Sequence, residues 1–204
     1  MKKGADVTTQ PNLDPDPFTQ FRKWYDEAVS AGVQQLDAMT LATATKEGKP
    51  SARLVFYKGI NNKRFLFYTN YESQKGRELL QNPMAALVFY WPSLHRQVRV
   101  EGDVEKLSYE ESNRYFQTRS RESQLGAWAS RQSEIIAGRE VLEECIARLQ
   151  HEYEGKEIPC PPFWGGFCLI PDKFEFWIGG ANRLHDRFCY LQRADSWEIV
   201  RLSP

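Results

Sequence analysis

The chain has 204 residues, of which 41% are hydrophobic, and its 27 basic side chains balance its 27 acidic ones. This length and apolar content suffice for one domain with a substantial core. Zero net charge argues against a protein that binds nucleic acid or an anionic membrane through its overall field. Four cysteines without a Cys-x-x-Cys pair, and no apolar N-terminal run, predict a cytoplasmic protein with reduced thiols. No histidine has metal-ligand spacing to cysteine or acidic residues, so we expect no metal site.

The N-terminal part predicts an arm, a helix and a group of hairpins. Residues 1–16 are polar and rich in proline, and we interpret them as a flexible arm before a single domain over 17–204. Asp16 and Pro17 predict a helix start, and an apolar stripe follows that ends at Gly32. Strands rich in β-branched or aromatic residues are expected over 39–45, 52–58, 65–69 and 85–91. The connections between the first three are too short for helical crossovers, which favours antiparallel pairing.

The remaining chain alternates short helices with strands. A helix over 73–81 would end before Pro83, and a strand follows over 97–107. Ser108 and Glu111 form a capping box that opens another helix. Further elements are a helix with the apolar stripe 141–149 and strands at 166–170, 174–177, 187–191 and 197–202. About eight or nine antiparallel strands with peripheral helices predict an α+β fold, mainly antiparallel β, closed as a barrel or sandwich.

A dense polar segment lies between two aromatic-rich strands near the C-terminus. Gly179-Gly180 marks a turn, and in an extended chain Arg183, His185 and Arg187 would then share one face. Three potential cations on one face suit an anionic ligand. The alternative is a solvated edge strand whose charges discourage aggregation.

Two other polar clusters are suited to phosphate. Residues 73–76 combine hydroxyl, ammonium and a predicted helix N-terminus, although taken singly Ser73 is a plain N-cap and Lys75 a solvated helix residue. A helix end followed by a polar loop is expected around Tyr115, Arg119, Arg121 and Ser123. Together the clusters favour a ligand with more than one phosphate, or two phosphorylated ligands. The glycine loops of nicotinamide and nucleoside-triphosphate sites are missing, as is a Gly-x-Ser-x-Gly nucleophile elbow.

The order of these motifs resembles the pyridoxine (pyridoxamine) 5'-phosphate oxidase family, whose members are flavin mononucleotide (FMN) enzymes with an FMN-binding split β-barrel. The resemblance covers roughly residues 17–204. It rests on Arg53-Leu54-Val55-Phe56-Tyr57-Lys58, Phe67-Tyr68-Thr69-Asn70, Arg96-Gln97-Val98, Tyr115-Phe116 with Arg119, Ser123-Gln124-Leu125-Gly126-Ala127-Trp128, Arg131-Gln132-Ser133, Phe163-Trp164-Gly165-Gly166, Glu175-Phe176-Trp177, Arg183-Leu184-His185-Asp186-Arg187 and Arg201-Leu202-Ser203-Pro204.

The resemblance implies a set of binding residues at the matching positions. The FMN contacts would be Arg53, Leu54, Val55, Phe56, Tyr57, Lys58, Tyr68, Thr69, Gln74, Lys75, Gln97, Gln132, Ser133, Trp177 and Arg187. The substrate contacts would be Lys58, Tyr115, Arg119, Ser123, Arg183, Leu184 and His185. Among these, Arg183 and His185 would be catalytic, because they hold the substrate ring over the flavin.

The implied reaction oxidises pyridoxine or pyridoxamine 5'-phosphate to pyridoxal 5'-phosphate in vitamin B6 biosynthesis and salvage. Hydride would pass from the substrate C4' carbon to flavin N5, and O2 would be the acceptor that yields H2O2. The family is a homodimer with two sites at the subunit interface, each built from both chains. That implies small-molecule partners and a second copy of the chain, and neither nucleic acid nor membrane.

Two departures leave other functions open. The family commonly has Arg where this chain has Gln74, and glutamine where it has Ile178. The alternatives are another split-barrel flavin reductase or oxidoreductase, and a non-catalytic protein that binds flavin or pyridoxal phosphate. An oligonucleotide-binding barrel with aromatic stacking platforms is disfavoured by the zero net charge.

Overall fold

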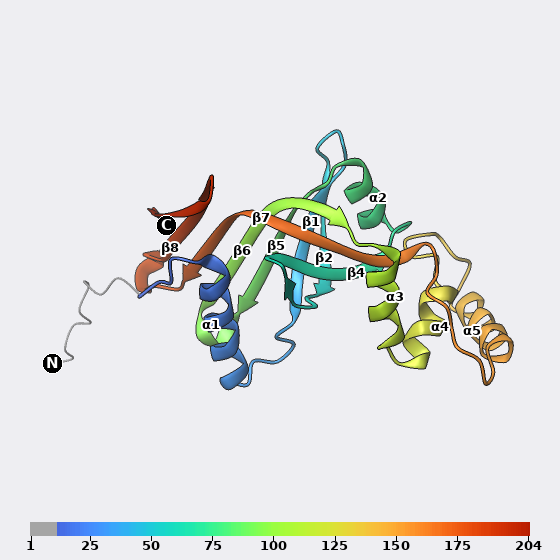
Figure 1. Ribbon diagram of the computed structural model, residues 1–204. Coiled ribbons are helices and arrows are strands. Elements are labelled where there is room, and N and C mark those ends of the chain that lie inside the picture. Colours follow the sequence, from blue (N-terminus) through green and yellow to red (C-terminus); the bar gives the residue numbers. More distant parts are fainter. Residues whose placement is uncertain (1–11) are drawn as a thin grey trace. The chain divides into compact units, whose positions relative to one another are not determined.

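The computed structural model describes residues 12–204, and Figure 1 shows how the elements follow one another. The helices of this part are α1 (Pro17–Ser30), α2 (Gln74–Gln81), α3 (Tyr109–Gln117), α4 (Arg121–Ala129) and α5 (Glu140–Glu152), with short 3-10 turns η1 (Pro92–Leu94) and η2 (Ala181–Arg183). The strands are β1 (Ala38–Ala44), β2 (Pro50–Phe56), β3 (Ile60–Asn61), β4 (Arg64–Asn70), β5 (Met84–Trp91), β6 (Arg96–Lys106), β7 (Trp164–Ile178), β8 (Asp186–Arg193) and β9 (Ser196–Leu202). No helix among them is long and apolar enough to span a membrane.

The strands form one sheet in the order β2-β1-β5-β6-β7-β4-β3, with β8 next to β7 and β9 next to β8. The pairs β1 with β2, β4 with β7 and β7 with β8 are all antiparallel. The predicted α+β fold, mainly antiparallel β, is therefore confirmed.

Strand β7 is longer than the sequence predicts. We expected two strands, 166–170 and 174–177, with a break at Pro171, but Trp164–Ile178 is one strand of 15 residues. Its pairing with β4 ends at Leu169, and its pairing with β8 begins at Lys173. Pro171 lies between these two ladders, so the missing backbone N–H costs neither of them a hydrogen bond.

The chain divides into two compact units. The first comprises the residues up to Leu36 together with Tyr90–Val98 and Lys173–Pro204. Here the Asp16 carboxylate caps α1, as predicted, and the apolar stripe of the helix packs on aromatic residues of the C-terminal strands. Trp24 meets Phe176 edge to face at 5.1 Å, and Phe18 meets Phe174 at 5.2 Å.

Residues 1–11 of the predicted flexible arm lie outside the described residues. The adjoining residue Asp14 is attached to the first unit: its carboxylate pairs with Lys23 at 2.8 Å, and its carbonyl oxygen accepts a hydrogen bond from the Tyr190 hydroxyl at 2.8 Å. The C-terminal end of the predicted arm is therefore bound to α1 and β8.

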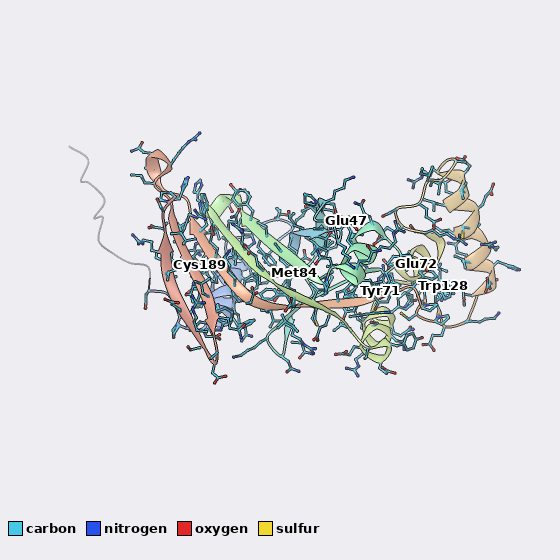
Figure 2. All side chains as sticks on the ribbon, turned by 90° about the horizontal axis from the view of Figure 1, so that it is seen from above. Glu47, Tyr71, Glu72, Met84, Trp128 and Cys189 are labelled. Carbon is cyan, nitrogen blue, oxygen red and sulfur yellow. The ribbon has the colours of Figure 1, made fainter. Side chains whose placement is uncertain are left out.

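The second unit comprises Asp37–Phe89 and Arg99–Asp172. Its strands bury an apolar face that includes Leu41, Phe67 and Leu87. The helices α3, α4 and α5 lie together (Figure 1) around a smaller cluster formed by Phe116, Leu125, Leu149, Ile158, Cys160 and Trp164. Trp128 of α4, labelled in Figure 2, donates its indole N–H to the carbonyl of Pro159 at 2.8 Å.

The prediction of a polar loop after Arg119 is wrong, because Arg121–Ala129 forms α4. The Ser120 hydroxyl accepts a hydrogen bond from the backbone N–H of Ser123, which is a regular N-cap. Only Gln124 and Leu125 of this helix are buried. So narrow an apolar contact leaves almost no 3.6-residue periodicity to detect.

Candidate active site

Strand β2 presents different chemistry on its two faces. Leu54 and Phe56 are exposed on one face, whereas Ser51, Arg53 and Val55 are partly buried on the other. The Arg53 guanidinium donates to the Thr43 hydroxyl at 2.6 Å and to the Leu41 carbonyl at 3.2 Å, both on β1, and also to the Ser51 hydroxyl. Arg53 is thus held against the sheet by its own and the neighbouring strand.

Helix α2 brings a buried lysine to the same region. Lys75 is 8% exposed, and its ammonium donates to Thr69 at 3.3 Å, Ser73 at 3.2 Å and Gln132 at 3.0 Å. All three acceptors are neutral oxygens. Burial and then the nearby charge of Arg53 lower the pKa of Lys75 to about 8, with the charge of Glu78 opposing. The reading of Lys75 as a solvated helix residue is therefore wrong.

Several of the predicted FMN contacts meet around this lysine. Thr69 hydrogen-bonds Gln132 at 3.2 Å, and the backbone N–H of Gln74 donates to the Ser133 hydroxyl at 3.1 Å. Ser133 has a positive φ of 76°. The segment around Gln132 thus joins the N-terminus of α2, where backbone N–H groups and a cation favour a phosphate.

A second cation lies beside stacked aromatic rings. The rings of Tyr68 and Tyr115 stack with centroids 3.8 Å apart, and the guanidinium of Arg119 lies 4.6 Å from the centroid of Trp164. The Nη1 atom of Arg119 is buried and has no hydrogen-bond partner among the described residues. Burial lowers the pKa of this guanidinium. A buried donor without an acceptor is rare in proteins, and a ligand oxygen at this position would satisfy it.

The other predicted substrate-phosphate residues are less closely grouped. Ser123 lies in the first turn of α4, three residues from the Ser120 cap, and their hydroxyls are 3.0 Å apart. Lys58 follows β2 and pairs with Asp37 at 3.6 Å. Among residues 12–204, no hydrogen bond or ion pair joins Lys58 to Tyr115, Arg119 or Ser123.

The segment after Gly179 in the first unit differs from its prediction. Arg183, His185 and Arg187 do not share one face of an extended chain, because Ala181–Arg183 forms a 3-10 turn and β8 begins only at Asp186. Asn182 and Arg183 both have positive φ, 56° and 63°. Such backbone costs about 1 kcal/mol per non-glycine residue, and strain of this kind clusters at functional sites.

Within this turn the imidazole of His185 is fixed in a defined state. The backbone N–H of Gly180 donates to His185 Nδ1 at 3.1 Å, and the ring lies 4.7 Å from the Trp177 ring. A nitrogen that accepts a hydrogen bond carries no proton, so the proton of the neutral ring is on Nε2. His185 can therefore donate a hydrogen bond through Nε2. Arg183 and Leu184 are exposed beside it.

Arg187 of the first unit forms a bidentate ion pair with a buried carboxylate. Its Nε and Nη2 atoms donate to the two carboxylate oxygens of Glu175 at 3.1 and 2.9 Å, and Nη1 donates to the Ser203 carbonyl at 2.8 Å. The hydrogen bonds to Glu175 raise the pKa of Arg187 further. The neighbouring positions are Trp177, opposite Arg187 in the β7–β8 ladder, and Ile178, opposite Asp186. Gln97 lies near the start of β6.

Three residues in these clusters were not predicted as site residues: Glu78, which no motif contains, and Glu175 and Trp164, which stand in the quoted motifs without a predicted role. Each is buried, and each orders a predicted residue that comes from elsewhere in the chain. The position of Glu78 four residues after Gln74 was the available signal, because such a spacing puts both on one face of a helix.

The second unit also contains a cavity of about 660 Å³ between the segment 131–137 and α5, lined partly by Ile135, Ile136, Val141 and Cys145. None of the predicted binding residues lines it. The candidate site is therefore defined by the polar clusters and not by this cavity.

Comparison with known proteins relates most of the chain to one family. The family model described as pyridoxamine 5'-phosphate oxidase matches residues 25–152, and that of the pyridoxine 5'-phosphate oxidase C-terminal dimerisation region matches residues 164–204. The chain is 54% identical over 193 residues to a pyridoxine/pyridoxamine 5'-phosphate oxidase of Nostoc sp., with 94% of this chain and 90% of the relative covered. It is also 54% identical over 193 residues to that of Coxiella burnetii, with 95% and 98% covered.

Solved structures agree with the fold. PhzG from Burkholderia lata, in complex with tetrahydrophenazine-1-carboxylic acid, has a TM-score of 0.90 at 30% identity and covers 98% of this chain and 100% of its own. A pyridoxamine 5'-phosphate oxidase-related, FMN-binding protein from Nostoc punctiforme has a TM-score of 0.72 at 18% identity, with 94% and 100% covered. The second likeness shows the fold alone.

Proposed function

Because the chain belongs to the pyridoxamine 5'-phosphate oxidase family, we propose that it is an FMN-dependent oxidase that converts pyridoxine 5'-phosphate or pyridoxamine 5'-phosphate to pyridoxal 5'-phosphate. Two further relatives with this name are 50% and 55% identical to it over 96% and 93% of the chain. Bound FMN supplies the acceptor for the hydride from the substrate C4' carbon and passes the electrons to O2, which yields H2O2.

The observation that carries the proposal is a pair of cations that lack a carboxylate partner. Lys75 is buried among neutral oxygens, and Arg119 has a buried Nη1 atom without an acceptor. Buried charges are normally paired, so both positions fit an anion. Two such positions fit the two phosphates of an FMN enzyme with a phosphorylated substrate, and the donor set suits FMN.

We assign the Lys75 cluster to the FMN phosphate, with Thr69, Gln132 and Ser133 as its neighbours. The assignment uses the α2 N-terminus, whose backbone N–H groups favour an anion. The other family positions, including Arg53, Gln97, Trp177 and Arg187, would complete the flavin contacts. In the family the two sites are built from both chains of a homodimer, and the match of residues 164–204 to the dimerisation region supports the same assembly here.

For the substrate, we assign its phosphate to Arg119 with Tyr115, Ser123 and Lys58. Arg119 contributes the buried unpartnered nitrogen. Arg183 and His185 would hold the pyridine ring. His185 donates from Nε2 because Gly180 occupies its other nitrogen, so its role is orientation of a substrate oxygen or nitrogen.

The test is a flavin assay on the purified protein. We expect FMN to be bleached under anaerobic conditions by pyridoxine or pyridoxamine 5'-phosphate and restored by air, with H2O2 formed. A protein that binds FMN without bleaching would instead be the non-catalytic binder, and bleaching by a reduced nicotinamide coenzyme alone would indicate a flavin reductase.

Variants of the ring-binding turn separate the two ligands. Arg183→Ala and His185→Ala should retain FMN and fold while turnover slows, because we place both side chains on the substrate. Loss of FMN with normal turnover after the cofactor is replenished would show that these residues serve the flavin.

A further inference from the structure

Glu78 is a buried carboxylate of α2 that neither motif nor family resemblance marks as a site residue. Its side chain accepts hydrogen bonds from the Ser51 hydroxyl at 2.6 Å, from the Thr43 hydroxyl and from the Gln74 amide at 2.9 Å. The Arg53 guanidinium lies 3.5 Å away. Burial alone would raise the pKa of Glu78, but these hydrogen bonds and the charge of Arg53 bring it to about 2. The group is therefore an anion at any physiological pH.

The carboxylate sets the direction of the hydrogen bonds around Arg53. Thr43 and Ser51 each have one hydroxyl proton, and both donate it to Glu78. Their lone pairs then face Arg53, which donates to both hydroxyls. With Leu41 and Glu78 as the other acceptors, both Nη atoms are used and the Nε–H is left for a ligand. Glu78 thereby fixes which edge of the guanidinium remains available.

Gln74 belongs to the same network. The family commonly has an arginine at this position, but here the Gln74 amide donates to Glu78. The two residues are four apart on α2, where an arginine would form an ion pair with the glutamate. A neutral amide satisfies one carboxylate oxygen and leaves the other to Ser51, Thr43 and Arg53.

We propose that Glu78 is a positioning residue of the flavin phosphate site, which orients Arg53 through Ser51 and Thr43, and that Gln74 supports Glu78 in this role. The inference rests on the proposed function in one respect, since it takes the FMN phosphate as the anion that Arg53 and Lys75 bind. Glu78 itself, being an anion, makes no contact with that phosphate.

The test compares two flavins that differ only in the phosphate. Flavin-free full-length protein is titrated with FMN and with riboflavin, and the quenching of flavin fluorescence gives each Kd. Glu78→Gln removes the charge and keeps the shape. We expect FMN to bind about tenfold more weakly, as for the loss of one charge-assisted hydrogen bond, while the Kd of riboflavin changes by less than about twofold.

Glu72→Gln is the matched control. Glu72 is exposed on the segment that enters α2 (Figure 2), and its carboxylate has no contact with Arg53. Removing this charge should leave the Kd of both flavins unchanged. It also calibrates the effect that a nearby negative charge has on the phosphate through space.

The outcomes separate the possible roles of Glu78. Equal weakening of FMN and riboflavin would mean a purely structural role, and tighter FMN binding would mean that Glu78 merely repels the phosphate. Either result overturns the inference. If Glu78→Gln fails to fold, Ser51→Ala removes one of the two hydroxyls through which Glu78 orients Arg53, and it should weaken FMN about twofold to threefold with riboflavin unchanged; an unchanged ratio of the two Kd values overturns the inference.

Failure of this inference is distinct from failure of the proposed function. A wild-type protein that prefers FMN to riboflavin but does not oxidise the B6 vitamers contradicts the function alone. A wild-type oxidase in which Glu78→Gln affects both flavins equally contradicts the role of Glu78 alone. A wild-type protein that binds neither flavin contradicts both.

Discussion

Our assignment of the FMN phosphate to Lys75 predicts that FMN binds more weakly above pH 8, because burial has made this lysine a weaker base. Burial, followed by the charge of Arg53, lowers the pKa of Lys75 to about 8, and Glu78 opposes this only in part. Of the groups that act on Lys75, Arg53 remains charged across this range, and Glu78 has a pKa of about 2. The acceptors Thr69, Ser73 and Gln132 do not titrate. The second pKa of a phosphate monoester is about 6, so FMN is already a dianion.

The size of the effect follows from linkage. FMN binds the protonated form of Lys75, which is half populated at about pH 8 and about one tenth populated at pH 9. Between pH 7 and pH 9 the apparent Kd should therefore rise about tenfold, which corresponds to about 1.4 kcal/mol. Riboflavin has no phosphate and should show no such dependence.

Flavin titrations at pH 7, 8 and 9 measure this directly, with Lys75→Met as the test variant. Its FMN affinity at pH 7 should fall by about 1.5 to 3 kcal/mol, the value of a hydrogen bond to a charged group, and should then be independent of pH. Lys106→Met is the control, because Lys106 lies over the Tyr71 ring at 3.9 Å and outside the Lys75 cluster. A pH dependence that survives in Lys75→Met, or is missing in the wild type, refutes the reasoning.

The lowered pKa of Lys75 also predicts that rising pH, which weakens FMN binding, stabilises the flavin-free protein. Its folded pKa of about 8 lies below the ordinary lysine value of 10.5, so between these values the unfolded state binds more protons than the folded state. The free energy of unfolding should therefore rise with pH from about 8 to 10.5, and the destabilisation by the buried charge is fully present below pH 8. Lys75→Met removes this destabilisation, so urea unfolding at pH 7 should show that the flavin-free variant is more stable than the wild type. The same variant should bind FMN less well.

Other variants test the remaining clusters. Arg187→Ala leaves the buried Glu175 carboxylate without its bidentate partner, and urea unfolding should show a loss of about 2 to 3 kcal/mol; a loss below about 0.5 kcal/mol would mean that the pair is not structural. Gly180→Ala puts a Cβ 1.9 Å from the Leu184 carbonyl oxygen, so turnover should fall as His185 loses its hydrogen bond. The control is Gly126→Ala, whose Cβ meets nothing within 4 Å. Its turnover should be unchanged, and its free energy of unfolding should be equal to that of the wild type or higher by up to about 1 kcal/mol. Equal activity in both glycine variants would contradict the role of the turn. Arg119→Gln should raise the KM for the phosphorylated substrate about tenfold or more without changing FMN affinity, and an unchanged KM would remove Arg119 from the phosphate site.

Local signals in the sequence predicted most of the elements. Asp16 with Pro17 and Ser108 with Glu111 cap α1 and α3 as expected, because a cap depends on side chains within three residues of the helix start. The errors lie where longer-range contacts decide the structure. Pro171 is tolerated because β7 changes partners there. The turn at Ala181–Arg183 needs two positive φ angles that alternation cannot reveal.

Which cations lack an internal carboxylate partner could not be derived from the sequence, because the carboxylates that pair with the other cations come from elsewhere in the chain. Arg53 of β2 has Glu78 of α2, Lys58 has Asp37, and Arg187 of β8 has Glu175 of β7.

Motif by motif, these cations are indistinguishable from Lys75 and Arg119. The difference is visible only after folding, when Lys75 is surrounded by neutral oxygens and Arg119 has a buried nitrogen without an acceptor. A buried cation without an ion-pair partner destabilises the fold, and a bound anion relieves that cost. Our proposal that a protein of zero net charge binds two phosphates therefore rests on the arrangement of its ion pairs and not on their sum, because that arrangement leaves Lys75 and Arg119 without a carboxylate partner.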